Sequence, residues 1–134
     1  ELFGGGQAEL RLDDENHPLE AGIEIIAQPP GKKLQNINLM SGGEKTMTAI
    51  ALMFAVLKTK PTPFCILDEV EAALDDANID RFAAYLRNFK NIQFAIVTHQ
   101  KATMEYADVL YGVTMPEQGI SKVLSLRLGD DFDI

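Results

Sequence analysis

Two acidic residues, Asp68 and Glu69, directly follow the short apolar run at residues 64–67. A run of this length and apolarity predicts a parallel strand buried on both faces. Ligands in open α/β sheets bind at the carboxyl ends of strands, and unpaired carboxylates leaving a buried strand are costly. Mg²⁺ prefers oxygen ligands and keeps several waters, so one carboxylate plus phosphate oxygens can hold it. Asp68 and Glu69 therefore predict a magnesium-site acid beside a water-activating acid.

The other acids between residues 68 and 80 have a simpler interpretation. This stretch also contains Glu71, Asp75, Asp76 and Asp80, and it has no basic residue. We expect Glu71, Asp76 and Asp80 to belong to a solvated acidic loop and the helix that follows it. Asp75 or Asp76 is expected to be the N-cap of that helix.

A histidine, His99, occupies the matching place after a second apolar run at residues 94–97. Because the carboxyl ends of neighbouring parallel strands meet at one edge of a sheet, we expect Asp68 and His99 to open onto the same edge. That position favours a polar contact between His99 and a transferring phosphate. A lone histidine is more often structural, so both interpretations stay open at this point.

The third candidate site is the start of a helix at residues 41–44. Ser41 and Glu44 have the spacing of a capping box, which by itself indicates a plain N-cap. Gly42 and Gly43 are poor helix formers that a cap does not need, and they allow another backbone or a ligand to approach closely. A helix N-terminus with bare N–H groups favours anions such as phosphate.

Other kinds of site lack the residues they need. The phosphate-binding pattern G-x-x-x-x-G-K-[ST] is absent, as is a G-x-S-x-G elbow. There are too few ligands for a zinc site. The single Cys65 cannot form an internal disulfide, which favours a reducing compartment, and we expect it to be a small core residue.

These candidate residues require an α/β fold to position them. Alternating and apolar patterns predict strands at residues 8–12 and 22–27, and the first of these is expected to be half-buried. Apolar residues on nearly all faces predict a buried helix over residues 43–58. A strand, helix and strand follow, with the strands at 64–67 and 94–97 and a helical repeat over 79–89 between them. A short helix near 102–107 and a hairpin of strands 109–115 and 120–128 complete the chain.

Composition is that of one ordinary folded unit. The chain has 134 residues, of which 46% are hydrophobic and 24% charged, and its formal net charge is -8. This mixture argues against disorder, and the charge disfavours a surface that binds nucleic acid or an anionic membrane throughout. No stretch has the apolar length of a membrane span, so no membrane association is expected.

Read together, the three candidate sites resemble motifs of the ABC-type ATPases. Residues 40–44 match the signature sequence, residues 64–69 the Walker B strand, residues 73–75 the D-loop, and His99 the switch histidine. Longer stretches resemble the SMC (structural maintenance of chromosomes) family, of the bacterial chromosome-condensation type: LMSGGEKTMTAIALMFAVL at 39–57, PFCILDEVEAALDDANIDRF at 63–82 and VTHQKATMEYADVLYG at 97–112.

This resemblance implies that residues 1–134 are the C-terminal segment of a split ATPase head. The implied fold is the C-terminal lobe of that head, α/β, with a mostly parallel sheet, flanking helices and antiparallel strands at the ends. The N-terminal segment with Walker A, the coiled coil and the hinge would be absent, which accounts for the missing phosphate loop. We expect this segment to be inactive until the N-terminal segment is supplied.

The resemblance also implies the chemistry. ATP would be hydrolysed at two composite sites between engaged heads, with Mg²⁺ held by Asp68. Glu69 would orient and deprotonate the attacking water, and His99 would contact the γ-phosphate. The nucleotide carried by the opposite head would be bound by the signature and D-loop residues, which are Ser41, Gly42, Gly43, Glu44 and Asp75.

Implied partners are the N-terminal half of the same head, a second SMC head in a homodimer, a kleisin subunit, and DNA through the assembled complex. The implied location is the cytoplasm, at the nucleoid, and the implied role is chromosome condensation and segregation. A related ABC ATPase of DNA repair or recombination and a mainly structural kleisin-binding module are the alternatives. A local basic surface from Lys58, Lys60, Lys101, Arg81, Arg87 and Lys90 stays open.

Overall fold

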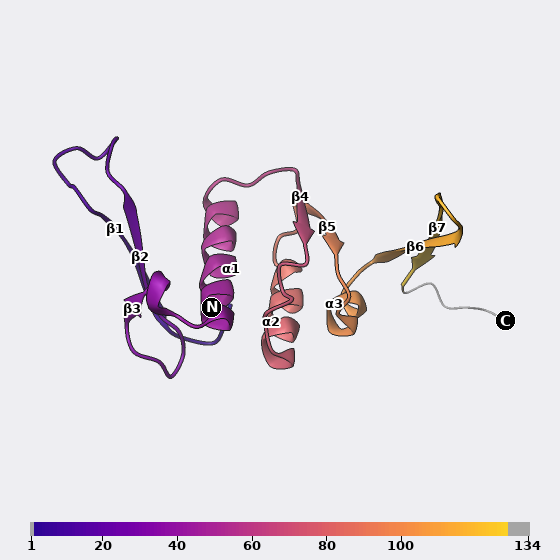
Figure 1. Ribbon diagram of the computed structural model, residues 1–134, viewed down its shortest axis with the longest axis horizontal. Helices are drawn as coiled ribbons and strands as arrows, with labels where there is room; N and C mark the ends of the chain where they lie inside the picture. Colours follow the sequence, from indigo (N-terminus) through magenta and orange to yellow (C-terminus); the bar gives the residue numbers. More distant parts are fainter. Residues whose placement is uncertain (1, 129–134) are drawn as a thin grey trace.

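The computed structural model describes residues 2–128, which form an α/β fold of helices and paired strands (Figure 1). The expected fold class is therefore confirmed. The small β3 and the 3₁₀ helix η1 were not predicted. In chain order the elements are β1 (Gln7–Leu12), β2 (Ile23–Gln28), β3 (Gln35–Asn36), η1 (Ile37–Leu39), α1 (Gly42–Thr59), β4 (Phe64–Asp68), α2 (Asp76–Leu86), β5 (Gln93–Val97), α3 (Lys101–Glu105), β6 (Val109–Glu117) and β7 (Ile120–Arg127).

The strands of residues 2–128 form three small sheets. β1, β2 and β3 make an antiparallel sheet in that order, β4 and β5 pair in parallel, and β6 and β7 form an antiparallel hairpin. In the parallel pair Asp68 lies opposite Val97. The carboxyl ends of β4 and β5 therefore meet at one edge, as the sequence predicts.

The main core lies where α1, α2 and the parallel sheet meet. Phe54 of α1 contacts Phe82 of α2 with ring centroids 5.8 Å apart and stacks on Phe89 at 5.4 Å. Leu67 of β4 joins this cluster, so one face of the sheet is held against the two helices. Leu2 and Phe3 also belong to the core. Apolar burial of this kind is the main force that fixes the strand ends in place.

The prediction that β4 and β5 are buried on both faces is wrong for this chain. Cys65 and Leu67 face the helices, whereas Phe64, Ile66 and Val97 are 61%, 67% and 52% exposed. Because side chains alternate along a strand, these exposed residues share one face with Asp68. No described element covers that face, which is the physical reason for the difference.

Two further burial predictions are also wrong. Only four residues of α1 are buried, namely Thr48, Ile50, Phe54 and Leu57, and Val56 is largely exposed. All of β1 is exposed, because it pairs only with β2 and nothing described packs on either side.

An apolar groove of about 420 Å³ lies between β2, η1, α1 and β4. It is lined by Ile25, Ile37, Ala49, Leu52, Met53, Val56, Leu57 and Cys65.

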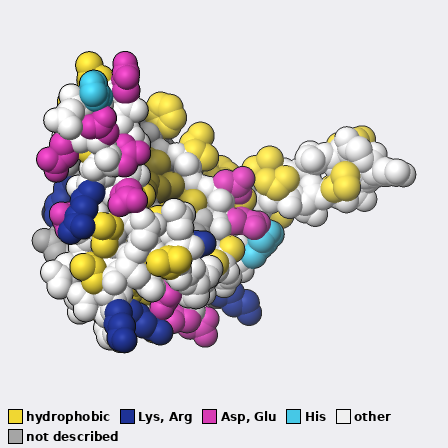
Figure 2. All heavy atoms as spheres, turned by 60° about the vertical axis from the view of Figure 1, so that its left-hand side comes forward, with side chains coloured by type: hydrophobic (Ala, Val, Ile, Leu, Met, Phe, Trp, Pro, Cys, Tyr) yellow, Lys and Arg dark blue, Asp and Glu magenta, His cyan; other side chains and the backbone are white. Residues whose placement is uncertain are grey.

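The β6–β7 hairpin extends away from the helices, and Figure 2 shows it as an arm projecting from the body of the molecule. The hairpin confirms the prediction, with one change at the turn. β6 continues through Pro116 to Glu117, and the pairing shifts register between Thr114 and Glu117. The turn is therefore shorter than predicted and comprises residues 118–119. Gly119 adopts a φ of +81°, a conformation that suits glycine.

Candidate functional site

The first group of predicted site residues lies at the carboxyl edge of the parallel sheet. Oε1 of Glu69 is 2.9 Å from Nε2 of His99, and the two side chains are 48% and 85% exposed. The backbone N–H of Glu69 donates to the carbonyl of Val97 at 2.9 Å. This edge therefore brings Glu69 and His99 into direct contact, which the sequence reasoning did not predict.

The backbone of Glu69 adopts the left-handed conformation, with a φ of +47°. It is the only residue other than glycine with a positive φ among residues 2–128. For an L-residue with a side chain this conformation costs about 1–2 kcal/mol, and such costs gather at functional sites. The turn at Glu69 follows the last residue of β4 and leaves the side chain beside His99.

Asp68 is exposed as the last residue of β4, on the uncovered face of the sheet. Among residues 2–128, no group of three or more His, Cys, Asp or Glu side chains could hold a metal ion without other ligands. An exposed carboxylate at a strand end fits Mg²⁺, because this ion takes most of its ligands from water and substrate phosphates. The donor set at this edge therefore fits a magnesium ion that arrives with a nucleotide.

Glu71 is not a solvated loop residue, and that prediction is wrong. Its side chain is 0% exposed. Oε1 of Glu71 accepts hydrogen bonds from the Thr98 hydroxyl at 2.5 Å and from the Thr103 hydroxyl at 3.1 Å. The turn after β4 directs Glu71 inward, toward the end of β5 and toward α3. A run of acidic residues does not distinguish this position from its exposed neighbours, so the sequence holds no local signal for the burial of Glu71.

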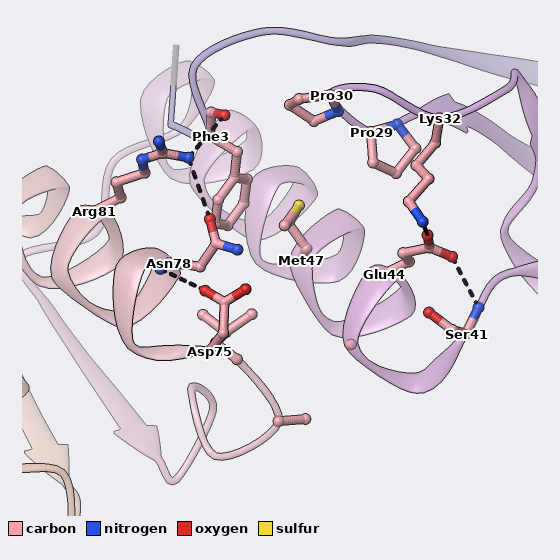
Figure 3. A pocket seen from close by; sticks show the side chains of 13 residues that line it. Phe3, Pro29, Pro30, Lys32, Ser41, Glu44, Met47, Asp75, Asn78 and Arg81 are labelled. Carbon is pink, nitrogen blue, oxygen red and sulfur yellow. Dashed lines mark hydrogen bonds and ion pairs between the residues drawn. The ribbon is translucent and has the colours of Figure 1, made fainter.

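The second group of predicted site residues lies around the N-terminus of α1. A pocket of about 420 Å³ lies between α1, α2 and the loop after β2, and Figure 3 shows side chains from all three around it. Predicted site residues Ser41, Gly43, Glu44 and Asp75 line it. The whole lining is Phe3, Pro29, Pro30, Lys32, Ser41, Gly43, Glu44, Met47, Ala73, Leu74, Asp75, Asn78 and Arg81.

Helix caps hold the polar residues of this pocket. The backbone N–H of Ser41 donates to Oε2 of Glu44 at 3.1 Å, and Nζ of Lys32 lies 3.3 Å from Oε1 of the same carboxylate. The hydrogen bond from Ser41 lowers the pKa of Glu44 below its usual value, and Lys32 adds to this effect. Asp75 is the N-cap of α2, where its Oδ1 accepts the Asn78 N–H at 2.8 Å.

The two glycines of the signature sequence differ in their surroundings. A Cβ on Gly43 would lie 3.3 Å from the carbonyl oxygen of Ala73, a tight contact with the residues matched to the D-loop. A Cβ on Gly42 would meet nothing within 4 Å, and Gly42 does not line the pocket. The close approach of the Ala73 backbone therefore explains why residue 43 is a glycine. No such contact explains the glycine at residue 42.

The structure thus places the predicted site residues in two groups. Glu69, His99 and the adjoining Asp68 lie at the sheet edge, and none of them lines the pocket that holds Ser41, Gly43, Glu44 and Asp75. One group offers carboxylates and an imidazole, and the other offers the N-terminus of a long helix. Such a division suits a site for metal and water chemistry and a separate site for an anionic group.

Comparison with known proteins gives the family to which this chain belongs. Residues 3–122 match the RecF/RecN/SMC N-terminal domain. The chain is 66% identical over 128 residues to the chromosome partition protein Smc of Bacillus subtilis, covering 95% of this chain and 11% of that protein. It belongs to the RecF/RecN/SMC family, and within that family it resembles SMC proteins.

Solved structures of SMC heads have the same fold. One, from a study of ATP-driven dimerisation and DNA-stimulated activation of SMC ATPases, has a TM-score of 0.83 and 44% identity and covers 95% of this chain and 77% of that one. Another is the Smc head of Pyrococcus furiosus with an extended coiled coil, bound to the C-terminal domain of ScpA. It has a TM-score of 0.84 and 45% identity, covering 95% of this chain and 32% of that one.

The chain spans about a tenth of the length of the curated Smc relatives it matches. Within residues 2–128, no helix has the length and apolarity needed to cross a membrane.

Proposed function

We propose that this chain is the C-terminal half of an SMC ATPase head, which works with the N-terminal half to bind and hydrolyse ATP between two engaged heads. The observation that carries this proposal is the 2.9 Å contact between Glu69 and His99 at the edge where β4 and β5 end. It joins the carboxylate that directly follows β4 to the imidazole that comes two residues after the end of the neighbouring parallel strand, β5. The matches to SMC heads support the assignment.

In this mechanism Asp68 holds Mg²⁺, which would neutralise phosphate charge when bound. Glu69 orients the attacking water and accepts its proton. Its left-handed backbone and its contact with His99 hold the carboxylate in place before substrate arrives. His99, which is largely exposed, is available to contact the γ-phosphate. Phosphoryl transfer depends mainly on positioning and charge stabilisation, which these residues provide.

The pocket at α1 serves the nucleotide of the opposite head. Ser41 and Gly43 present backbone and hydroxyl groups at the N-terminus of an 18-residue helix, where the helix dipole favours phosphate. Gly42 and Glu44 belong to the same signature sequence, and Asp75 supports the contact between heads. Hydrolysis then requires engagement, because the groups that act on one nucleotide come from two subunits.

The N-terminal half of the head covers the exposed apolar face of the parallel sheet. Phe64, Ile66 and Val97 form this face, and the apolar groove beside α1 is a second surface of the same kind. Apolar area of this extent stabilises association when it is removed from water. The same assignment explains why the phosphate-binding loop is missing from this chain.

The role in the cell is chromosome condensation and segregation, with a kleisin subunit and DNA as partners of the assembled complex at the nucleoid. Solved SMC heads bound to the C-terminal domain of ScpA support the kleisin partner. The alternative is a repair or recombination ATPase, and the matched family also includes RecF and RecN. A nuclease rather than a kleisin in the purified complex would favour that alternative.

The test is Glu69→Gln in the complete head, made by combining this chain with its N-terminal segment. We expect ATP turnover to fall by about 10²–10⁴-fold, the range for loss of a general base, while ATP-dependent engagement of heads is retained. The chain without the N-terminal segment serves as a control and is expected to show no turnover. Near-normal turnover by the Gln variant, or sustained turnover by the chain alone, would contradict the proposal.

A further inference from the structure

Glu71 is a fully buried carboxylate that no step of the proposed reaction uses. Its side chain is 0% exposed, and two hydroxyl groups, those of Thr98 and Thr103, donate to Oε1. Oε2 has no hydrogen-bond partner among the described residues. The side chain is therefore only half satisfied in a position removed from water.

Such a carboxylate is a poor choice for stability. Burying a charged or polar group costs free energy unless it is hydrogen-bonded, and one of the two carboxylate oxygens of Glu71 is not. Residues that break a local rule of this kind tend to occur at functional sites. The position of Glu71, two residues after Glu69, places it close to the proposed reaction.

The hydrogen bonds around Thr98 have a defined direction. The hydroxyl oxygen of Thr98 accepts the backbone N–H of Gln100 at 2.9 Å, so its own hydrogen is directed to Glu71. Gln100 is the N-cap position of α3, and Thr103 lies within that helix. One oxygen of Glu71 thus ties the turn after β4 to the end of β5 and to α3.

These contacts close a ring through the sheet edge. Thr98 immediately precedes His99, whose Nε2 lies 2.9 Å from Glu69. The chain then leads from Glu69 through one residue to Glu71, whose carboxylate accepts from Thr98. Val97, just before Thr98, accepts the Glu69 N–H. Loss of the hydrogen bond between Thr98 and Glu71 would therefore leave the backbone next to His99 less firmly positioned.

We propose that Glu71 is a positioning residue, which fixes Thr98 and through it holds His99 against Glu69 in the arrangement needed for hydrolysis. This inference rests on the proposed function and deepens it, because it assigns a residue outside the matched motif roles to the same site. Because Glu71 is fully buried, it acts through Thr98 and His99. Its effect falls on the rate of the chemical step and not on nucleotide binding.

The experiment compares Glu71→Leu and Glu71→Gln in the complete head. Leu keeps the apolar volume and removes the acceptor, so we expect kcat to fall by about 10–100-fold, the usual cost of losing an orienting partner. The KM for ATP, ATP-dependent engagement and the melting temperature are expected to change little. Gln keeps Oε1 as an acceptor for both hydroxyls and should restore most of the turnover.

Two valine variants locate the effect. Thr98→Val removes the hydroxyl beside His99 at nearly constant shape, and we expect it to reproduce the kcat loss of Glu71→Leu. Combining the two changes should add little further loss, because they break one contact. Thr103→Val is the matched control, since it removes the other donor to the same oxygen, farther along the chain from His99, and should keep most of the turnover.

Unchanged kcat in Glu71→Leu would overturn the inference, as would a loss that tracks a fall in melting temperature or in head engagement. If Glu71→Leu does not fold, Thr98→Val decides: a fall in kcat at unchanged KM supports the inference, and normal kcat overturns it. Glu69→Gln in parallel separates the two proposals. An inactive Glu69→Gln with a fully active Glu71→Leu contradicts the role of Glu71 alone, whereas an active Glu69→Gln contradicts the proposed function.

Discussion

The sheet edge and the α1 pocket hold their polar residues by different means. At the sheet edge, Glu69 has a left-handed backbone and contacts His99, and the half-satisfied Glu71 is buried beneath them. In the pocket, Glu44 and Asp75 accept backbone N–H groups at helix N-termini, which is an ordinary stabilising arrangement. The left-handed backbone of Glu69 and the unpaired oxygen of Glu71 therefore cost stability with no structural benefit. In contrast, Glu44 and Asp75 in the pocket stabilise helix N-termini.

The two groups of residues therefore need different tests. At the sheet edge, loss of a side chain is expected to affect chemistry with little loss of stability. At the pocket, a variant can remove a helix cap and a ligand contact together, so the two effects must be separated by paired variants. The predictions below make that separation, beginning with the larger effect.

Ser41→Arg is expected to have the larger effect at the pocket. The long cationic side chain would fill the space in front of the helix N-terminus, where Ser41 is exposed, and block the opposite head. ATP-dependent dimers should disappear in gel filtration, and turnover should fall by about 10²-fold or more, as when transition-state donors are lost. ATP binding by the single head should persist.

Ser41→Ala is the matched control, because it removes the cap hydroxyl without adding bulk. It should lower the melting temperature slightly and weaken the ATP-dependent dimer much less than Ser41→Arg does, because the backbone N–H groups at the start of α1 remain available to phosphate. An unchanged dimer in Ser41→Arg would show that the pocket does not face a second head. A dimer lost equally in both variants, in proportion to the fall in melting temperature, would assign Ser41 to capping alone.

Glu44→Gln is expected to have the smaller effect, on stability and its pH dependence. The pKa of Glu44 is lowered in the folded protein by the Ser41 N–H, with Lys32 contributing. The carboxylate therefore stabilises the fold above its unfolded pKa of about 4.3, and this contribution is lost as pH falls through the lower folded value.

Thermal melting of the head at several pH values checks this. We expect Glu44→Gln to melt slightly below the unmodified protein near pH 7 and at the same temperature in acid. Glu20→Gln, a change at an exposed loop glutamate, is the control and should behave like the unmodified protein. A difference for Glu44→Gln that stays constant down to low pH would contradict the role of its charge.

The sequence predicted the elements well and their burial poorly. α1 and the strand pair β4 and β5 follow from periodicity and short apolar runs, which are local signals. Burial depends on which other elements cover a face. The run at residues 64–67 is apolar on both faces, yet Phe64 and Ile66 are exposed because nothing in the described residues lies over them. A local sequence pattern does not show which other elements will cover a face of a strand.

The candidate site shows the same limit. Strand ends located Asp68, Glu69 and His99 at one edge, because parallel neighbours end together. Glu71 was misassigned because its burial comes from tertiary contacts with Thr98 and Thr103, which are 27 and 32 residues away along the chain. A two-residue strand such as β3 is also too short to leave a periodic signal.

If the sheet edge of one head and the α1 pocket of another act on the same nucleotide, two inactive variants should restore activity to each other when they are mixed. Heads with Ser41→Arg retain Glu69, and heads with Glu69→Gln retain Ser41. In a mixed dimer one site has both intact groups and only the other site carries the arginine, so we predict that part of the ATP turnover reappears on mixing. A mixture as inactive as either variant alone would contradict the claim.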